Sequence, residues 1–241
     1  MKKIIFEAAE PHVDILLNKP EPSTNKVPKW YRDQKLFSNQ ESDYIKAFKK
    51  NPNVSLTYKL CVPLIDTITM GYTLVNSTDI LVKNVSEDIT KYEPVINWRT
   101  TFSPLDSQPP EMLGNYPIPT GYSSVSFRWN NDWKIITPSG YSLLLMHPSQ
   151  RHDLPFFTLT AVVDTDKFPN KLHLPFFIKE GFEGIIEAGT PIAQIIPIKR
   201  DVWKSEKKSF QEKSHILYNN AMKINFIRAY KNKIWSRKVY K

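Results

Sequence analysis

The sequence predicts an all-β core, a sandwich or barrel, that carries an extended N-terminal arm and a helical C-terminal tail. Between Val54 and Arg200, short segments rich in Val, Ile, Thr, Tyr and Phe alternate with Pro, Gly, Asn and Asp, which is typical of strands joined by turns. No Gly follows Gly189 and no Pro follows Pro197, so the end of the chain is free to be helical. The expected parts are residues 1–53, 54–200 and 201–241.

The first part is rich in Pro, Lys and Asn. The stretch "NKPEPSTNKVPKWY" cannot form long regular structure, because each Pro restricts its own backbone and that of the preceding residue. We expect a short strand over Lys3–Glu7, an extended arm and a short helix over Tyr44–Lys50. Trp30 and Tyr31 are expected to anchor the arm by packing on the body.

The core is expected to contain many short strands, of which eight segments are examples. Pro175 and Pro197 lie inside two of them, and a Pro cannot donate to a sheet ladder, so edge positions or bulges are predicted there. In "EAGTPIAQI" a tight turn directly precedes a strand, and Ile192 and Ile195 of this strand are expected to face the core. The eight segments are "VSLTYKLCV", "TDILVKNV", "SSVSFRWN", "WKIIT", "YSLLLMH", "FTLTAVVD", "KLHLPFFI" and "IAQIIPI".

The tail carries most of the net charge. The chain has a net charge of +9, and residues 201–241 contain 11 Lys or Arg and 3 Asp or Glu, a net of +8. Packing of an apolar helical stripe, with Lys and Arg facing water, is the preferred interpretation; weak nucleic-acid binding through phosphate contacts and stacking is the alternative. The stripe comprises Trp203, Phe210, Leu217, Phe226, Tyr230 and Ile234.

The cysteine content and the N-terminal sequence restrict the cellular compartment in which the protein is expected. A single cysteine, Cys61, excludes a disulfide within the chain and fits a reducing cytoplasm. A buried, inert thiol in an apolar strand is expected there rather than a nucleophile. The N-terminal "MKKIIFEAAEPHVD" fails as a signal peptide, because Glu7, Glu10 and Pro11 interrupt its apolar stretch. No membrane span is expected, which predicts a cytoplasmic protein, in a host cell or in a virion if a phage encodes it.

Four motifs occur in order along the core. They are "GYTL" at 71–74, "TPSGYSLLLMHPSQ" at 137–150, "AVVDTDKF" at 161–168 and "GTPIAQIIP" at 189–197. Together they resemble the motifs of the dUTPase/dCTP deaminase family over about 130 of the 241 residues, with an extra segment at about 84–131. The resemblance implies a β-clip, jelly-roll fold and a homo-oligomer, usually a trimer. The chain is also similar to uncharacterised proteins of phages and marine bacteria, which implies no activity.

The resemblance assigns candidate site residues. Asp164 matches the catalytic carboxylate that orients water or meets the sugar hydroxyl. Phosphate or nucleotide contacts are implied for Ser149 and Gln194, with Arg151 as a substitute for the family's arginine. Asp166 and Lys167 complete this nucleotide-binding set, although Lys167 stands where the family has a tyrosine.

Several of the family's functional groups are missing. Thr73 replaces the aspartate of the first motif, and Pro148 replaces the arginine that grips phosphate. The Gly-rich C-terminal arm and the deaminase glutamate are absent from the sequence. Two interpretations of Asp164 and Asp166 therefore stay open: a turn in which Asp164 accepts backbone N–H bonds, which is favoured, and a functional carboxylate pair.

A metal site is the less favoured interpretation of a group of histidines and carboxylates in the core. Two histidines and a carboxylate can hold Fe(II), but neighbours on a strand point to opposite faces, so surface or capping roles are expected instead. No metal ligand is therefore predicted. The residues concerned are His147, His152, Asp153, Asp164 and Asp166.

The preferred hypothesis is a non-catalytic, phage-type structural or interaction protein on a degenerate dUTPase-like fold. Self-association, as a trimer, and contacts with other virion proteins are its expected partnerships, without a cofactor. The alternative is a nucleotide-processing enzyme, a dNTP pyrophosphatase or deaminase, in which Mg²⁺ bridges the phosphates. A nucleotide-binding sensor without turnover is the third interpretation.

Overall fold

The computed structural model describes residues 2–17, 19–88, 91–168, 170–223 and 229–241. The chain forms two compact units. Unit 1 comprises residues 1–26 and 71–200, and unit 2 comprises residues 27–70 and 201–241. This division differs from the expected three parts, because the first 26 residues belong with the sheets and residues 54–70 do not.

Unit 1 contains the strands, so the expected β-rich class is confirmed. All pairings are antiparallel. The strands are β1 (Ile5–Ala8), β2 (Glu21–Pro22), β3 (Tyr72–Val75), β4 (Ile80–Asn84), β5 (Pro94–Trp98), β6 (Leu105–Ser107), β7 (Tyr122–Ile136), β8 (Tyr141–Met146), β9 (Phe156–Thr158), β10 (Ala161–Val163), β11 (Lys171–Lys179), β12 (Gly184–Ile186) and β13 (Pro191–Lys199). The unit also holds the helix α1 (Pro11–Leu16) and the 3-10 turns η1 (Ser23–Lys26) and η3 (Pro110–Met112).

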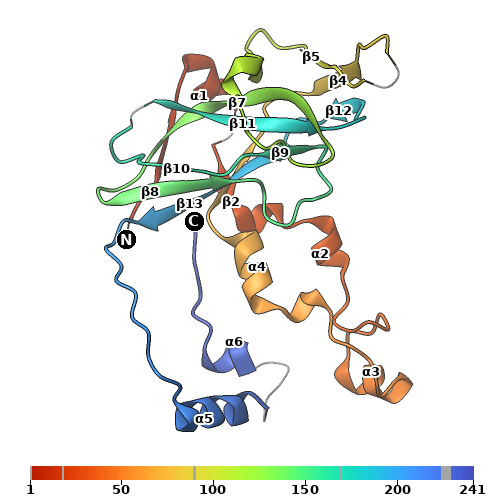
Figure 1. Cartoon of the computed structure of the whole chain (residues 1–241), viewed down its shortest axis with the longest axis vertical. Helices are drawn as coiled ribbons and strands as arrows, with labels where there is room; N and C mark the ends of the chain where they lie inside the picture. The colour runs from red at the N-terminus through yellow and green to blue at the C-terminus, as the bar shows by residue number, and fades with distance from the viewer. Residues whose placement is uncertain (1, 18, 89–90, 169, 224–228) are drawn as a thin grey trace. The chain divides into compact units, whose positions relative to one another are not determined.

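Two five-stranded sheets form layers within unit 1 (Figure 1). One has the order β1-β7-β11-β9, with β6 also on β7; the other has the order β10-β8-β13-β3-β2. A third sheet, β12-β4-β5, is smaller. The Thr158 hydroxyl joins the two large sheets: it accepts from Trp129 Nε1 at 3.2 Å and donates to the Ile192 carbonyl at 2.6 Å.

Apolar side chains fill the interior of unit 1. The Trp129 and Phe176 rings stack with centroids 3.8 Å apart, and both side chains are fully buried. Ile192 and Ile195 are buried as expected. Gly71 admits the close approach of β3 to β13: its φ is +73°, and a Cβ there would lie 2.0 Å from the Ile195 carbonyl oxygen.

The two prolines predicted at edge strands or bulges lie instead in interior strands, because β11 and β13 each have a neighbouring strand on both sides. Both lie where the pairing on one of these sides stops. Pro175 pairs with β7 on one side, while on the other side the pairing with β9 ends at Phe176. Pro197 pairs with β8, and the pairing with β3 ends at Ile195. The backbone nitrogen of each proline cannot donate a hydrogen bond. Each proline therefore has one side of its strand on which the hydrogen-bonded ladder is not continuous.

Unit 2 is helical. Its elements are α2 (Lys29–Asp33), α3 (Tyr44–Lys50), η2 (Tyr58–Leu60), α4 (Val62–Thr69), α5 (Glu212–Lys223) and α6 (Ala229–Lys233). The predicted helix over Tyr44–Lys50 is confirmed, with the Asp43 side chain as its N-cap. A small core contains Phe37, Ala47 and Val54. Tyr31 is buried, and its hydroxyl donates to the Lys59 carbonyl at 3.2 Å within the same unit.

The predicted strand "VSLTYKLCV" is wrong. Thr57 caps the turn η2, and Pro63 lies in the first turn of α4, a position that suits its fixed φ and missing N–H. These local signals outweigh the β-branched composition of the segment. Cys61 therefore lies at the N-cap of α4 and is partly exposed, not buried in a strand.

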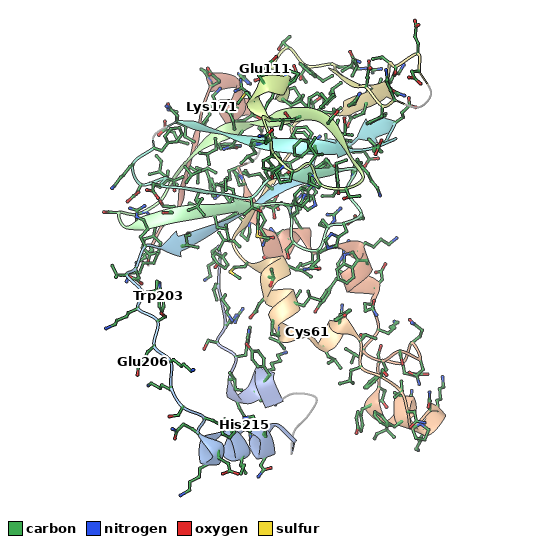
Figure 2. The ribbon with its side chains drawn as sticks, viewed as in Figure 1. Cys61, Glu111, Lys171, Trp203, Glu206 and His215 are labelled. Atoms are coloured by element: carbon green, nitrogen blue, oxygen red, sulfur yellow. The ribbon has the colours of Figure 1, made fainter. Side chains whose placement is uncertain are left out.

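The prediction of a helix from the start of the tail is also wrong. Residues 201–211 are extended, and α5 begins only at Glu212. Trp203 is 87% exposed, and Phe210 is 74% exposed although its ring lies 5.5 Å from that of His215, so little burial offsets the cost of ordering a helix there. Figure 2 labels Trp203 and Glu206 on this extended segment. Phe226 lies outside the described residues.

The last part of the tail does pack. Trp235 Nε1 and Lys238 Nζ each donate to Asp66 Oδ2 of α4 at 2.7 Å. No helix in the described part of the chain is both long enough and apolar enough to cross a membrane.

Candidate functional site

Asp164 and Asp166 lie in a tight turn directly after β10. The Asp164 carbonyl accepts from the backbone N–H groups of Lys167, at 2.9 Å, and Phe168, at 3.0 Å. The Asp164 side chain is 55% exposed, whereas the Asp166 side chain is 4% exposed. The turn therefore presents one carboxylate to solvent and buries the other.

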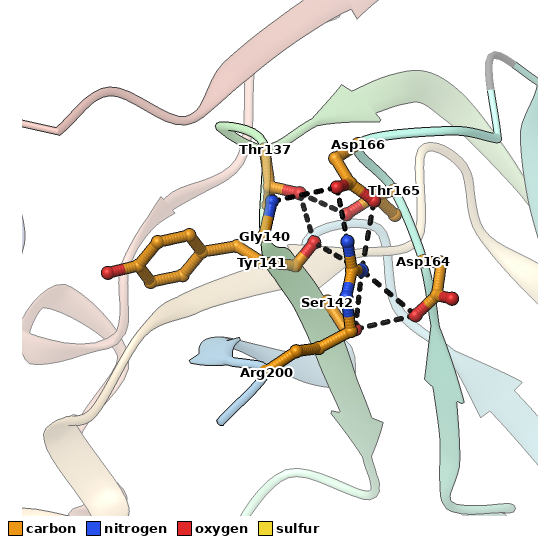
Figure 3. Close-up of polar contacts among 8 residues, drawn as sticks. All are labelled: Thr137, Gly140, Tyr141, Ser142, Asp164, Thr165, Asp166 and Arg200. Carbon is orange, nitrogen blue, oxygen red and sulfur yellow. Dashed lines mark hydrogen bonds and ion pairs between the residues drawn. The ribbon is translucent and has the colours of Figure 1, made fainter. Parts of the chain in front are cut away.

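Arg200, at the end of β13, contacts both carboxylates (Figure 3). Its Nη1 lies 2.9 Å from Asp166 Oδ1 and 3.1 Å from Asp164 Oδ1, and its Nη2 donates to Asp166 Oδ2. Nη1 also donates to the Ser142 hydroxyl at 3.0 Å and to the Tyr141 carbonyl at 3.1 Å. The guanidinium thus joins β8, the turn after β10 and the end of β13.

The turn before β8 supplies the remaining contacts. Gly140 N donates to Asp166 Oδ2 at 2.9 Å, and the Ser142 hydroxyl donates to Asp164 Oδ1 at 2.6 Å. The hydroxyls of Thr137 and Thr165 are 2.8 Å apart beneath them. Gly140 has a φ of +81°, which lets its N–H face the carboxylate.

These contacts lower the pKa values of both acids. The hydrogen bond from Arg200, with one from Gly140 N–H, lowers the pKa of Asp166 to about 2. The hydrogen bond from Ser142 and the charge of Arg200 lower the pKa of Asp164. The same carboxylates raise the pKa of Arg200. All three groups are therefore charged near neutral pH.

The structure separates Ser149 and Gln194, two of the predicted nucleotide contacts, from Asp164. Ser142 pairs with Ile198, and Met146 pairs with Gln194, so Gln194 lies roughly 13 Å along β13 from the residue opposite Ser142 and roughly 20 Å from Arg200. Gln194 is buried, and its Oε1 accepts from Ser149 N at 3.0 Å. Ser149 and Gln194 are thus together, but at the opposite end of β8 from Asp164.

The remaining candidates face other partners. Arg151 Nε lies 2.9 Å from Asp153 Oδ1, on the Ser149 side of β8. Lys167 is exposed, beside the Asp166 carboxylate whose pKa its charge helps to lower. The favoured interpretation had the Asp164 side chain accept backbone N–H bonds. In the structure Asp166 accepts such a bond, and Asp164 accepts from Ser142 and Arg200.

Both ring nitrogens of His147 are engaged. Nδ1 accepts from Thr158 N at 3.3 Å, so Nε2 carries the hydrogen and donates to the Arg151 carbonyl at 3.0 Å. Burial lowers the pKa of His147, which keeps the ring neutral. Across the described residues, no group of three or more His, Cys, Asp or Glu side chains could hold a metal ion.

Arg200 and Ser142 were not predicted from the sequence. Lys199 pairs with Tyr141, so Arg200 continues β13 directly beside the turn that contains Gly140. The only signal in the sequence was that Arg200 is a basic residue at the end of the last strand-like segment. Which side chains it contacts depends on which strands are neighbours in the sheet. No protein-family model matches this chain, and no curated protein matches it.

Proposed function

We propose that this chain is a non-catalytic structural or interaction protein whose β unit is a degenerate dUTPase-like scaffold of the β-clip, jelly-roll type. The observation that carries the proposal is the engagement of Asp164 and Asp166 by Arg200 of the same chain. In this proposal the carboxylates hold three strand ends together and do not perform chemistry.

The electrostatics of the pair support a structural role. A general base works best when its pKa lies near the operating pH. The pKa values of both acids are lowered, to about 2 for Asp166, so both are weak bases. Asp166 is also nearly buried and already accepts from Arg200 and Gly140. The position of Ser149 and Gln194 at the far end of β8 gives further support.

The exposed start of the tail supports an interaction role. Val202 is completely exposed, and Trp203 and Phe210 are largely exposed on a segment without helix or strand. Large apolar side chains in this state are typical of segments that a partner covers. We propose that a second copy of the chain covers them, in a homo-oligomer that we expect to be a trimer, in a phage virion or its host cytoplasm.

The oligomer proposal is tested by mass. The full-length chain and the double variant Val202→Ser/Trp203→Ser are compared by light scattering at several concentrations. A trimer that dissociates in the variant supports the proposal. A monomer in both proteins, or an unchanged trimer in the variant, contradicts the assigned role of this segment.

A nucleotide-dependent function is the second candidate, because Asp164 stays half-exposed beside a guanidinium. A dNTP pyrophosphatase or deaminase would use Asp164 to orient water, with Mg²⁺ bridging the phosphates; a sensor would bind without turnover. Each deoxynucleoside triphosphate is incubated with the protein and Mg²⁺, and release of phosphate and ammonia is followed together with the melting temperature. Turnover that Asp164→Ala abolishes overturns the structural proposal. A melting shift without turnover supports the sensor.

A further inference from the structure

The long strand β7 is interrupted opposite the start of β11. Lys171 pairs with Lys134, but His173 pairs with Asn130, so two steps along β11 correspond to four along β7. The Asn131 side chain holds this bulge by accepting from Trp133 N at 3.3 Å and donating to the Trp133 carbonyl. Bulges re-aim side chains and occur often beside functional sites. The residue displaced at this bulge is Asp132.

Asp132 lines two cavities of about 240 Å³ each. The two cavities share Asn130, Asn131 and Asp132, so the residues of the bulge form part of the wall of both. One is partly apolar and includes Leu74 and Ile192 in its lining. The other has mainly polar residues in its lining, including His12, Lys171 and His173 beside Phe102, and is called the polar cavity. All of these residues belong to unit 1.

The polar cavity contains hydrogen-bonding capacity that the protein does not use. His12 Nε2 is buried and has no hydrogen-bond partner among the described residues. The His12 ring stacks on Phe102, with centroids 5.2 Å apart. Buried polar atoms are nearly always paired in native proteins, so the Nε2 atom of this cavity-lining residue is an unsatisfied hydrogen-bonding group.

His173 adds an acceptor to the same wall. The Asn130 amide nitrogen donates to the Ser103 carbonyl, which leaves Asn130 Oδ1 to accept from His173 Nδ1 at 3.2 Å. Burial lowers the pKa of His173, so the ring is neutral at pH 7 and its Nε2 is an acceptor.

The charges around Asp132 leave it undercompensated. Lys171 lies at the start of β11 (Figure 2), but its ammonium pairs with Glu10 Oε1 at 3.0 Å. Asp106, which also lines the polar cavity, pairs with Arg128 at 3.0 Å. Asp132 instead has the Ser77 hydroxyl as its hydrogen-bond partner, and burial raises its pKa. Among the described residues no cation forms an ion pair with Asp132, although the charges of Lys171 and His12 partly offset the effect of burial on its pKa. A bound cation that pairs directly with this carboxylate would offset the cost of its burial.

We propose that the cleft at the β7 bulge binds a small organic cation with a planar amidinium or guanidinium head on Asp132 and a short apolar body in the cavity lined by Leu74 and Ile192. A planar head can donate two parallel hydrogen bonds to one carboxylate and still offer a donor to a neighbouring imidazole. This site is separate from the Arg200 cluster and does not depend on the proposed structural function.

Benzamidine and benzamide form a matched pair of probes, because they share shape but only benzamidine is charged. Binding is followed by amide NMR shifts of the full-length protein. We expect saturable benzamidine binding in the millimolar range or tighter, typical of a fragment of this size, with shifts centred on residues 130–133. Benzamide is expected to bind at least tenfold more weakly. Equal binding of both probes, or shifts elsewhere only, overturns the proposal.

Two variants test the residues. Asp132→Asn keeps the side-chain shape and is expected to weaken benzamidine binding at least tenfold, whereas Asp153→Asn, at an exposed carboxylate, is expected to leave it unchanged. His12→Phe keeps the stacking on Phe102 but removes Nε2, and a severalfold loss is expected. The two substitutions lie on different elements, so His12→Phe still tests the site if Asp132→Asn impairs folding. Unchanged affinity in either folded variant contradicts the assignment of that residue.

Discussion

Asp166 and Arg200 form a two-point ion pair that joins the turn after β10 to the end of β13. One arm of the pair spans 2.9 Å between Nη1 and Oδ1, and the other joins Nη2 to Oδ2. The parallel geometry of guanidinium and carboxylate favours such a pair over a single contact. A nearly buried carboxylate and the end of the last strand are thereby connected across 34 residues of sequence.

The Asp166 contacts predict a pH dependence of stability. The folded-state pKa of about 2 lies below the ordinary value of 3.8, so the folded protein binds this proton less tightly than the unfolded chain does. The stabilisation is therefore complete above about pH 4 to 5 and is lost as the pH falls toward 2. Melting temperatures of wild type and Asp166→Asn are compared from pH 2 to 7. The difference should be largest at neutral pH and vanish near pH 2; a constant difference contradicts this account.

Asp132 should show the opposite dependence. Burial raises its pKa, so the folded state retains the proton more strongly than the unfolded chain, and stability falls as the pH rises through 3.8 and then through the folded-state pKa. Asp132→Asn is therefore expected to raise the melting temperature at pH 7, because the neutral amide avoids the cost of desolvating a charge. The gain should disappear near pH 3. A lower melting temperature at pH 7 would contradict the proposed cost of this carboxylate.

Gly71→Ala is expected to destabilise unit 1 by about 3 kcal/mol or more, because the new Cβ would lie 2.0 Å from the Ile195 carbonyl oxygen in addition to a positive φ. Gly181→Ala is the matched control: its φ is +74°, but no atom lies within 4 Å of the added Cβ. That variant should lose only about 1 kcal/mol from the backbone strain. Urea unfolding measures both, and equal losses would contradict the steric explanation.

Asp66→Ala is expected to loosen the end of the tail. Trp235 Nε1 and Lys238 Nζ both lose their acceptor, which costs about 1–3 kcal/mol for a hydrogen-bonded pair that is partly buried. Hydrogen exchange within 229–241 should accelerate, while exchange in β8 and β13 should not change. Asp43→Ala, which removes the cap of α3, controls for a general effect on unit 2. Unaltered exchange in the tail would show that these contacts do not hold it.

The sequence alone determined the local structure where one backbone signal dominated. The alternation of β-branched residues and turn residues predicted the strands at 141–147 and 192–198. The absence of a continuous hydrogen-bonded ladder on one side of Pro175 and Pro197 followed from their missing N–H groups. The same propensities failed over 54–62, where Thr57 and Pro63 start helical turns. In the tail, helix-compatible composition was insufficient, because Trp203 at its start is 87% exposed and gains little from burial.

The tertiary structure decided which charged residues meet. "VVDTD" indicated that Asp164 and Asp166 share a turn, but nothing in the sequence placed Arg200 beside them, because that contact depends on β13 lying next to β8. The bulge at Asp132 likewise exists only as a mismatch between paired strands. Propensity acts within a few residues, whereas ion pairs and cavities depend on strand order and register, which many distant contacts set together.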